Sequence, residues 1–148
     1  MRFRPDVVIA DRFGTTAAIV EVKALNGASV QTATRYLRNL LVHGAVPHAR
    51  FVMLITPECG YLWSEPEKVL LETAPTLSFP MDRIVEHYLP ADGAHVPVRD
   101  LVLEPIVRQW LADLSEGIVV DPRVENSLDE IGFLEVVRGG RVYTQTPA

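Results

Sequence analysis

Two carboxylates and one amine near the start of the chain have the types and spacing that phosphodiester hydrolysis requires. Asp6 follows Pro5, and Glu21 is separated from Lys23 by Val22 alone. Two carboxylates on neighbouring strands can converge on a hard cation such as Mg²⁺, which takes oxygen ligands and retains waters. We expect a backbone carbonyl near Val22 to be the remaining metal ligand that the protein supplies. The Lys23 ammonium would then orient or activate a water, or stabilise developing negative charge.

The Glu-x-Lys pattern is uncommon for this composition. With 11 Glu and two Lys in 148 residues, it is expected by chance roughly 0.15 times. The competing interpretation is structural: Asp6 caps a turn, and Glu21 and Lys23 form a weak ion pair on a solvated strand face.

A hairpin is predicted to carry these side chains. Residues 7–10 are typical of a short strand, residues 11–15 have turn chemistry with Gly14 free to adopt positive φ, and residues 17–24 predict a second strand. Side chains alternate along a strand, so Glu21 and Lys23 are expected on one face.

A helix is predicted to follow the hairpin, from Val30 to about residue 43, with Ser29 as its N-cap. Its apolar face is expected to pack on the sheet. Its opposite face would carry Gln31, Thr34, Arg35 and Arg38. We expect Gln31 near the loop after Lys23. The two arginines would meet nucleic-acid phosphates, or else form a plain solvated helix face.

The remaining pattern predicts an α/β fold with a central mixed sheet. Strands are expected at 50–56 and 60–64, and Ser64 and Glu67 suggest a capping box at the start of a short helix. Further helices are predicted at 81–89 and 103–116, and a hairpin at 133–137 and 141–144 around two glycines. Trp63 and Trp110 are interpreted as core anchors.

The motifs resemble the PD-(D/E)XK nuclease superfamily, whose fold is restriction-endonuclease-like. The resemblance rests on Pro5-Asp6, on Glu21-x-Lys23 and on Gln31 in the next helix, and it covers roughly residues 4–64. The N-terminal nuclease domain of type I restriction motor subunits is the most similar in arrangement. The resemblance implies that Asp6 and Glu21 bind Mg²⁺ or Mn²⁺, with a share from Val22. It also implies that Lys23 is the catalytic lysine and that Gln31 supports the site.

The family core usually begins with a helix, often bearing a Glu, and a strand before Pro-Asp. Here Pro-Asp stands at residues 5–6. Three alternatives follow: a later helix such as 103–116, with Glu104, fills the place; a second subunit does so, which favours a homodimer; or the chain is a truncated relative. We expect one domain over 1–148, with a nuclease-like core at 1–64 and a C-terminal helical and hairpin elaboration at 65–148.

Composition restricts the functional classes. The chain has a formal net charge of −5, which argues against a general polyanion-binding surface but leaves room for a local basic one. A single cysteine excludes an intramolecular disulfide framework and a Cys-rich zinc site. No apolar run approaches the roughly 20 residues of a membrane helix, and the N-terminus lacks a secretory h-region. We therefore expect a cytoplasmic protein away from membranes, and the resemblance implies that it acts on DNA. The alternatives are a catalytically inactive relative that binds nucleic acid or protein, and a structural domain with a chance motif.

Overall fold

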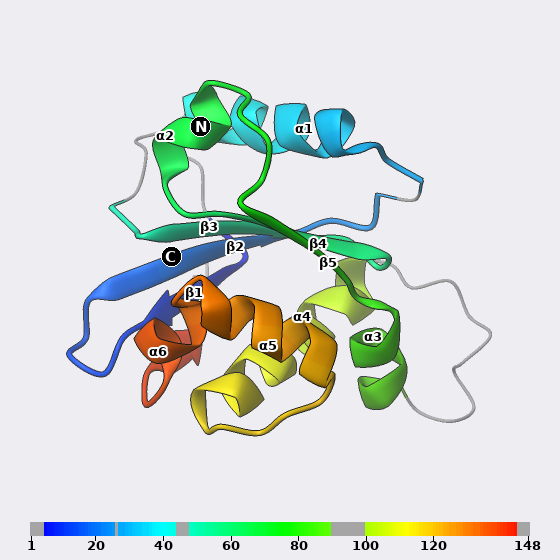
Figure 1. Ribbon diagram of the computed structural model, residues 1–148. Helices are drawn as coiled ribbons and strands as arrows, with labels where there is room; N and C mark the ends of the chain where they lie inside the picture. The colour runs from blue at the N-terminus through cyan, green and yellow to red at the C-terminus, as the bar shows by residue number, and fades with distance from the viewer. Residues whose placement is uncertain (1–4, 26, 44–47, 90–99, 145–148) are drawn as a thin grey trace.

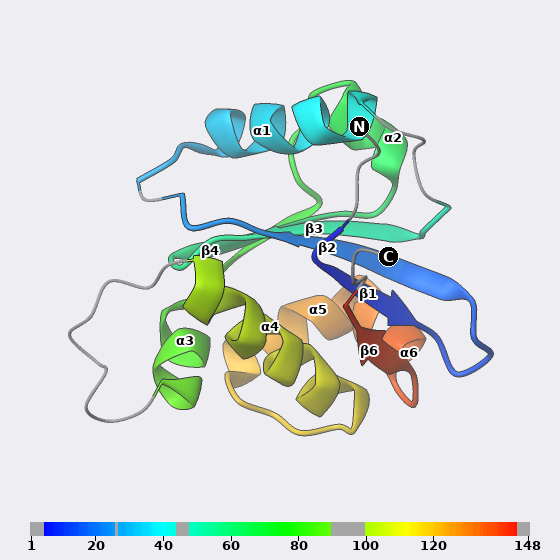
Figure 2. The same cartoon turned by 180° about the vertical axis from the view of Figure 1, so that it is seen from behind.

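A six-stranded mixed sheet forms the centre of the computed structural model, with helices on both faces (Figure 1). The structure describes residues 5–25, 27–43, 48–89 and 100–144. The strand order is β5-β4-β3-β2-β1-β6. Helices α1 and α2 cover one face, and α3 to α6 cover the other (Figures 1 and 2). This arrangement confirms the predicted α/β class with a mixed sheet.

The predicted N-terminal hairpin is present. Strands β1 (Val7–Ala10) and β2 (Thr16–Val22) pair antiparallel, with Val7 opposite Val20. Asp11 Oδ1 closes the turn by accepting hydrogen bonds of 2.9 Å from the backbone N–H groups of Phe13 and Thr15. Strand β2 ends two residues before the predicted limit, although the Lys23 N–H still donates to the Ile55 carbonyl.

A parallel crossover follows the hairpin. Helix α1 (Val30–Val42) connects β2 to β3 (Phe51–Ile55), and the two strands pair in parallel. Ser29 caps the helix as predicted, since its Oγ accepts a hydrogen bond of 3.1 Å from the Thr32 N–H. The apolar side of α1 packs with Ile19 and Trp63 in a core on this face of the sheet.

Strand β4 (Cys59–Trp63) pairs antiparallel with β3, and helix α2 (Pro66–Leu70) follows. The predicted capping box does not form: Glu65 is the N-cap and makes no capping bond. The Ser64 hydroxyl instead forms a 2.8 Å hydrogen bond with the Thr76 hydroxyl. The Thr76 hydroxyl also accepts a hydrogen bond from the Ser64 N–H. This contact leads the chain into β5 (Leu77–Pro80), an edge strand that the sequence pattern did not predict.

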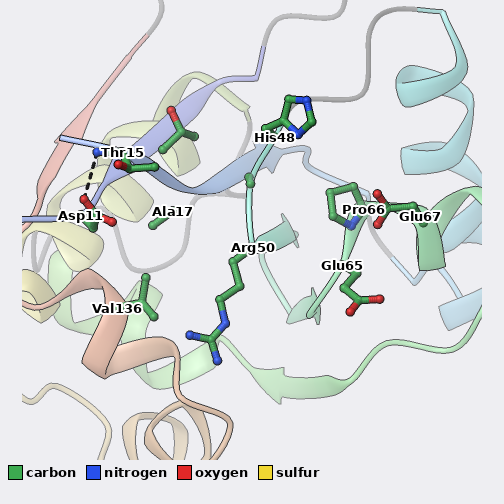
Figure 3. A pocket seen from close by; sticks show the side chains of 11 residues that line it. Asp11, Thr15, Ala17, His48, Arg50, Glu65, Pro66, Glu67 and Val136 are labelled. Atoms are coloured by element: carbon green, nitrogen blue, oxygen red, sulfur yellow. Dashed lines mark hydrogen bonds between the residues drawn. The ribbon is translucent and has the colours of Figure 1, made fainter. Parts of the chain in front are cut away.

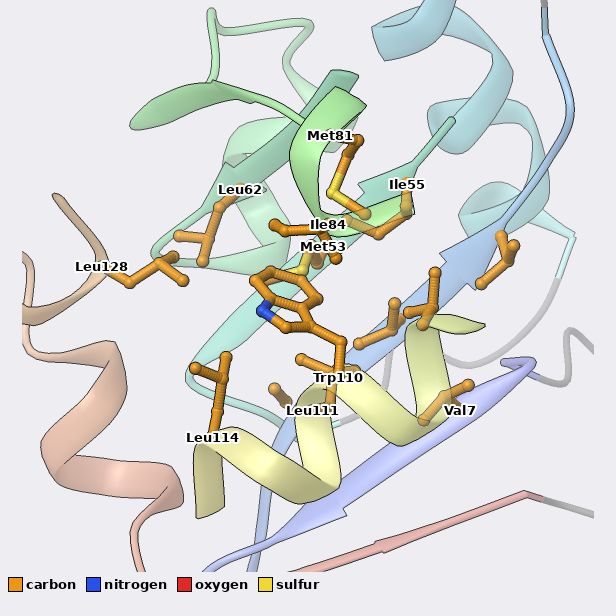
Figure 4. Close-up of a cluster of buried hydrophobic side chains, with 14 of the residues drawn as sticks. Val7, Met53, Ile55, Leu62, Met81, Ile84, Trp110, Leu111, Leu114 and Leu128 are labelled. Atoms are coloured by element: carbon orange, nitrogen blue, oxygen red, sulfur yellow. The ribbon is translucent and has the colours of Figure 1, made fainter. Parts of the chain in front are cut away.

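Four helices build the opposite layer: α3 (Asp82–Tyr88), α4 (Asp100–Ser115), α5 (Pro122–Glu130) and α6 (Phe133–Val137). Their apolar side chains surround the fully buried Trp110, which contacts the sheet through the core drawn in Figure 4. The interpretation of Trp63 and Trp110 as core anchors is therefore confirmed. The helix α5 was not predicted. Its N-cap is Asp121, whose side chain accepts from the Arg123 N–H.

The predicted C-terminal hairpin is wrong. Residues 133–137 form α6 rather than a strand, because Phe133 and Val137 lie one helical turn apart and are both buried against the same core. Strand β6 (Arg141–Tyr143) forms near the predicted place but pairs antiparallel with β1. A Cβ at Gly140 would lie 2.2 Å from the Ala10 carbonyl oxygen, so only glycine permits this approach.

The segment after residue 64 supplies both edge strands, β5 and β6, as well as four helices of one face. It is thus part of the same sheet rather than an addition beside it. Strand β5 pairs with the free edge of β4, and β6 pairs with the free edge of β1.

Candidate functional site

Asp6 is fixed at the point where β1 begins. Its Oδ2 accepts a hydrogen bond of 2.8 Å from the backbone N–H of Val22. The last paired residues of the two strands are Val7 and Val20, so the carboxylate extends the pairing by one more hydrogen bond. This contact places the Asp6 carboxylate next to the end of β2, where Glu21 lies.

Glu21 lies in β2, between β1 and the parallel strand β3, where it is paired with Leu54. Its side chain is half-buried, and its Oε2 is shielded from solvent with no hydrogen-bond partner. Burial is the largest of three influences that together raise the pKa of Glu21 to about 9; the others are the charge of Asp6 and a side-chain hydrogen bond with Asp6. At neutral pH, and without a cation, Glu21 therefore holds a proton.

Lys23 follows directly after β2. Its backbone N–H donates a 3.0 Å hydrogen bond to the Ile55 carbonyl and continues the parallel pairing. Its positive charge acts against the other influences by lowering the pKa of Glu21, so the ammonium is in electrostatic range of that carboxyl. Asp6, Glu21, Val22 and Lys23, four of the predicted site residues, thus meet at one end of the β1–β2 hairpin.

A third acidic residue approaches from the helical layer. Glu104, in α4, is half-buried, and burial raises its pKa, with a further contribution from the negative charge of Asp6. Arg108, one turn later, acts in the opposite direction. This placement agrees with the alternative in which a later helix carrying Glu104 reaches the site. The sequence signal was a single carboxylate near the start of an apolar helix.

The donor set fits a hard cation only in part. Among residues 5–25, 27–43, 48–89 and 100–144, no three His, Cys, Asp or Glu side chains are close enough together to hold a metal ion by themselves. However, Asp6 and Glu21 offer oxygen ligands, and the unpartnered Glu21 Oε2 is a buried acceptor that a cation would satisfy. Mg²⁺ commonly takes one or two carboxylates and completes its coordination with water.

Helix α1 positions Gln31. It is exposed in the first turn of α1 and lines a hollow of about 510 Å³ together with Ser29, Thr34, Arg35 and Glu72. None of the contacts of Asp6 and Glu21 described above involves it.

The two arginines predicted to meet phosphates both reach the segment after β4. Arg38 Nε donates a 3.1 Å hydrogen bond to the Leu70 carbonyl, and Arg35 Nε lies 3.5 Å from Glu72 Oε1. Arg38 therefore helps to hold α2 against α1. The Arg35 pair is mostly exposed and contributes little to stability.

A second hollow, of about 610 Å³, lies at the other end of β2 (Figure 3). It is bordered by His48 and Arg50, whose side chains extend in opposite directions in Figure 3, and by Asp11, Glu65 and Glu67. It contains charges of both signs and none of the predicted site residues, because Glu21 and Lys23 are at the opposite end of the strand.

Comparison with family models, curated proteins and solved structures finds no match for the chain. In the part of the chain that the structure describes, none of the helices is both long and apolar enough to cross a membrane.

Proposed function

We propose that the chain is a divalent-metal-dependent nuclease domain that hydrolyses DNA phosphodiester bonds. The single observation that carries the proposal is the Asp6–Glu21 pair, with its shielded and unpartnered oxygen, in electrostatic range of Lys23. Burying a second carboxylate beside the first raises the pKa of Glu21 to about 9, which is a cost that a purely structural site has no reason to carry.

Asp6 and Glu21 would hold Mg²⁺ or Mn²⁺, with the Val22 carbonyl as the third protein ligand. When bound, the cation would supply Lewis-acid polarisation of the phosphate and a lower pKa for a bound water. Glu21 loses its proton to act as a ligand. The Lys23 ammonium would orient the attacking water or stabilise charge on the phosphate oxygens.

Glu104 and Gln31 have supporting roles in this proposal. Glu104 would accept hydrogen bonds from water at the edge of the site, since it lies in electrostatic range of Asp6. Gln31 would help to organise the site only if the first turn of α1 approached when DNA binds, because it is exposed beside another hollow. In this proposal α4 of the same chain takes the place of the helix that precedes Pro-Asp in the family, so a second subunit is not needed to supply that helix.

A second function, a catalytically inactive nucleic-acid or protein interaction module, is favoured by one observation. Asp6 already serves the fold through its bond to the Val22 N–H, and protonated Glu21 shares a hydrogen bond with it. Both of these contacts form without a cation.

A cleavage assay on single- and double-stranded DNA, with Mg²⁺, with Mn²⁺ and with chelator, separates the two functions. Lys23→Ala should reduce metal-dependent cleavage by at least about a hundredfold. Lys68→Ala is the matched control, because Lys68, in α2, is the only other lysine. Absence of cleavage by the wild-type chain, or equal loss in both variants, would overturn the nuclease proposal. DNA binding without cleavage would support the interaction module.

A further inference from the structure

The tip of the β1–β2 hairpin and the turn before β6 form one corner of the molecule, far along β1 from Asp6. Ala10 is paired with Arg141, and a Cβ at Gly139 would lie 3.8 Å from the Arg12 Cβ. The two turns border a hollow of about 430 Å³ that Arg12, Arg141 and Tyr143 line.

Two arginines at this corner stack on aromatic rings. The Arg12 guanidinium carbon lies 4.9 Å from the centre of the Phe13 ring, and that of Arg141 lies 5.7 Å from the Tyr143 ring. The ion pairs in the described part of the chain involve other arginines, Arg35 and Arg123. A guanidinium that stacks through its face keeps the N–H donors on its edge free, and these donors match the oxygens of a phosphate.

Phe13 is the most exposed large apolar side chain of the described chain, at 79%. A ring this exposed adds little to the buried core, and the turn is closed by the Asp11 side chain together with backbone hydrogen bonds of Asp11 with Gly14 and Thr15. An exposed aromatic ring beside cationic groups is the arrangement on which unpaired nucleic-acid bases stack.

The local charge contrasts with the net −5 of the chain. Arg12 and Arg141 are exposed, and so is Arg138, immediately before the turn. Asp11 also lines the hollow, but its Oδ1 is occupied by two backbone N–H groups. The corner therefore presents more positive than negative charge to a ligand.

We propose that Arg12, Phe13, Arg141 and Tyr143, here named the hairpin-tip surface, bind single-stranded nucleic acid. The arginines contact backbone phosphates, and Phe13 stacks on a base. Duplex DNA fits less well, because its bases are already stacked and Phe13 would have no free base face to contact. The inference is independent of the metal site, which lies about 15 Å away along β1.

Fluorescence anisotropy tests the proposal with labelled oligothymidylate and oligouridylate, in chelator so that no cleavage intervenes. Arg12→Ala and Arg141→Ala should each weaken binding several-fold and reduce the salt dependence by about one counterion. Phe13→Ala should weaken binding at least about fivefold. The matched control is Arg83→Ala, an exposed arginine of α3, which should leave binding unchanged.

Both oligonucleotides offer phosphates and unpaired bases, so a difference between their affinities shows whether the surface prefers DNA or RNA. All three altered side chains are on the surface, so a melting temperature equal to that of the wild-type chain verifies folding. Three results would overturn the proposal: no binding of either oligonucleotide, equal effects of Arg83→Ala and Arg12→Ala, or equally tight binding of a polyaspartate peptide that Phe13→Ala does not weaken. The last result would mean that charge alone attracts the ligand.

Discussion

The carboxylate of Asp6 accepts a 2.8 Å hydrogen bond from the backbone N–H of Val22, 16 residues further along the chain. One side chain thereby joins the start of β1 to the end of β2. The same contact holds Asp6 beside Glu21, whose neighbourhood raises its pKa to about 9. The structural role of Asp6 needs an acceptor oxygen, whereas the proposed chemical role needs a negative charge, so substitution can separate the two.

Asp6→Ala and Asp6→Asn make that separation. Alanine removes the acceptor for the Val22 N–H and should lower the free energy of unfolding by about 1–2 kcal/mol. Asparagine keeps an acceptor oxygen and should lower it less, yet it removes the negative charge. Both variants should lose any stabilisation by Mg²⁺ or Mn²⁺, measured as the shift of melting temperature with added metal. A full metal-induced shift in Asp6→Asn would contradict the assignment of Asp6 as a ligand.

Glu21→Gln should change how stability depends on pH. The pKa of Glu21 is raised on folding from 4.5 to about 9, so the folded state binds the extra proton between these values. The free energy of unfolding therefore falls as pH rises from about 4.5 to about 9. Glutamine mimics the protonated form and should remove this fall, stabilising the metal-free protein by roughly 2 kcal/mol near pH 7, after allowance for partial exposure.

Urea denaturation of both proteins at several pH values checks this expectation. Near pH 4 the two curves should coincide, because Glu21 is then protonated in both the folded and unfolded states. Glu130→Gln, at an exposed position in α5, is the control for removing a carboxylate. A wild-type protein whose stability is flat across this range would refute the elevated pKa.

Metal binding should strengthen as pH rises. A cation and a proton compete for Glu21, so apparent affinity should increase by up to about tenfold per pH unit below pH 9 and binding should release a proton. Titration calorimetry with Mn²⁺ in two buffers of different ionisation enthalpy measures that proton directly. Affinity that does not change with pH would place the cation elsewhere than on Glu21.

Arg38→Ala and Arg35→Ala distinguish a structural role from DNA contact on α1. Arg38 donates to the Leu70 carbonyl, so its loss should lower the free energy of unfolding by about 1 kcal/mol. Loss of Arg35, whose partner Glu72 is half-exposed, should cost no more than about 0.5 kcal/mol. If α1 also contacts phosphates, both variants weaken DNA binding to a similar degree. If neither variant weakens DNA binding, the two arginines have only a structural role.

Local patterns predicted the first half of the fold well. The hairpin, the capped helix α1 and strands β3 and β4 each follow from short-range signals: a turn with an Asp and a Gly, a Ser at the N-cap, and continuous apolar runs. The failures lie where a distant contact decides. Residues 133–137 have β-branched side chains that suit a strand, but their burial against the helical layer makes them a helix.

The candidate site divides in the same way. The sequence alone determined that Asp6, Glu21 and Lys23 would gather on one hairpin, because alternation and a short turn fix which side chains share an end of two paired strands. Only the tertiary structure decided what surrounds them. Helix α4 begins 78 residues after β2 ends, yet it brings Glu104 into range of Asp6, while Gln31, only eight residues after Lys23, lies by another hollow. Proximity along the chain does not fix proximity in space once helices pack, since the core around Trp110 sets the position of α4 and the separate core around Trp63 sets that of α1.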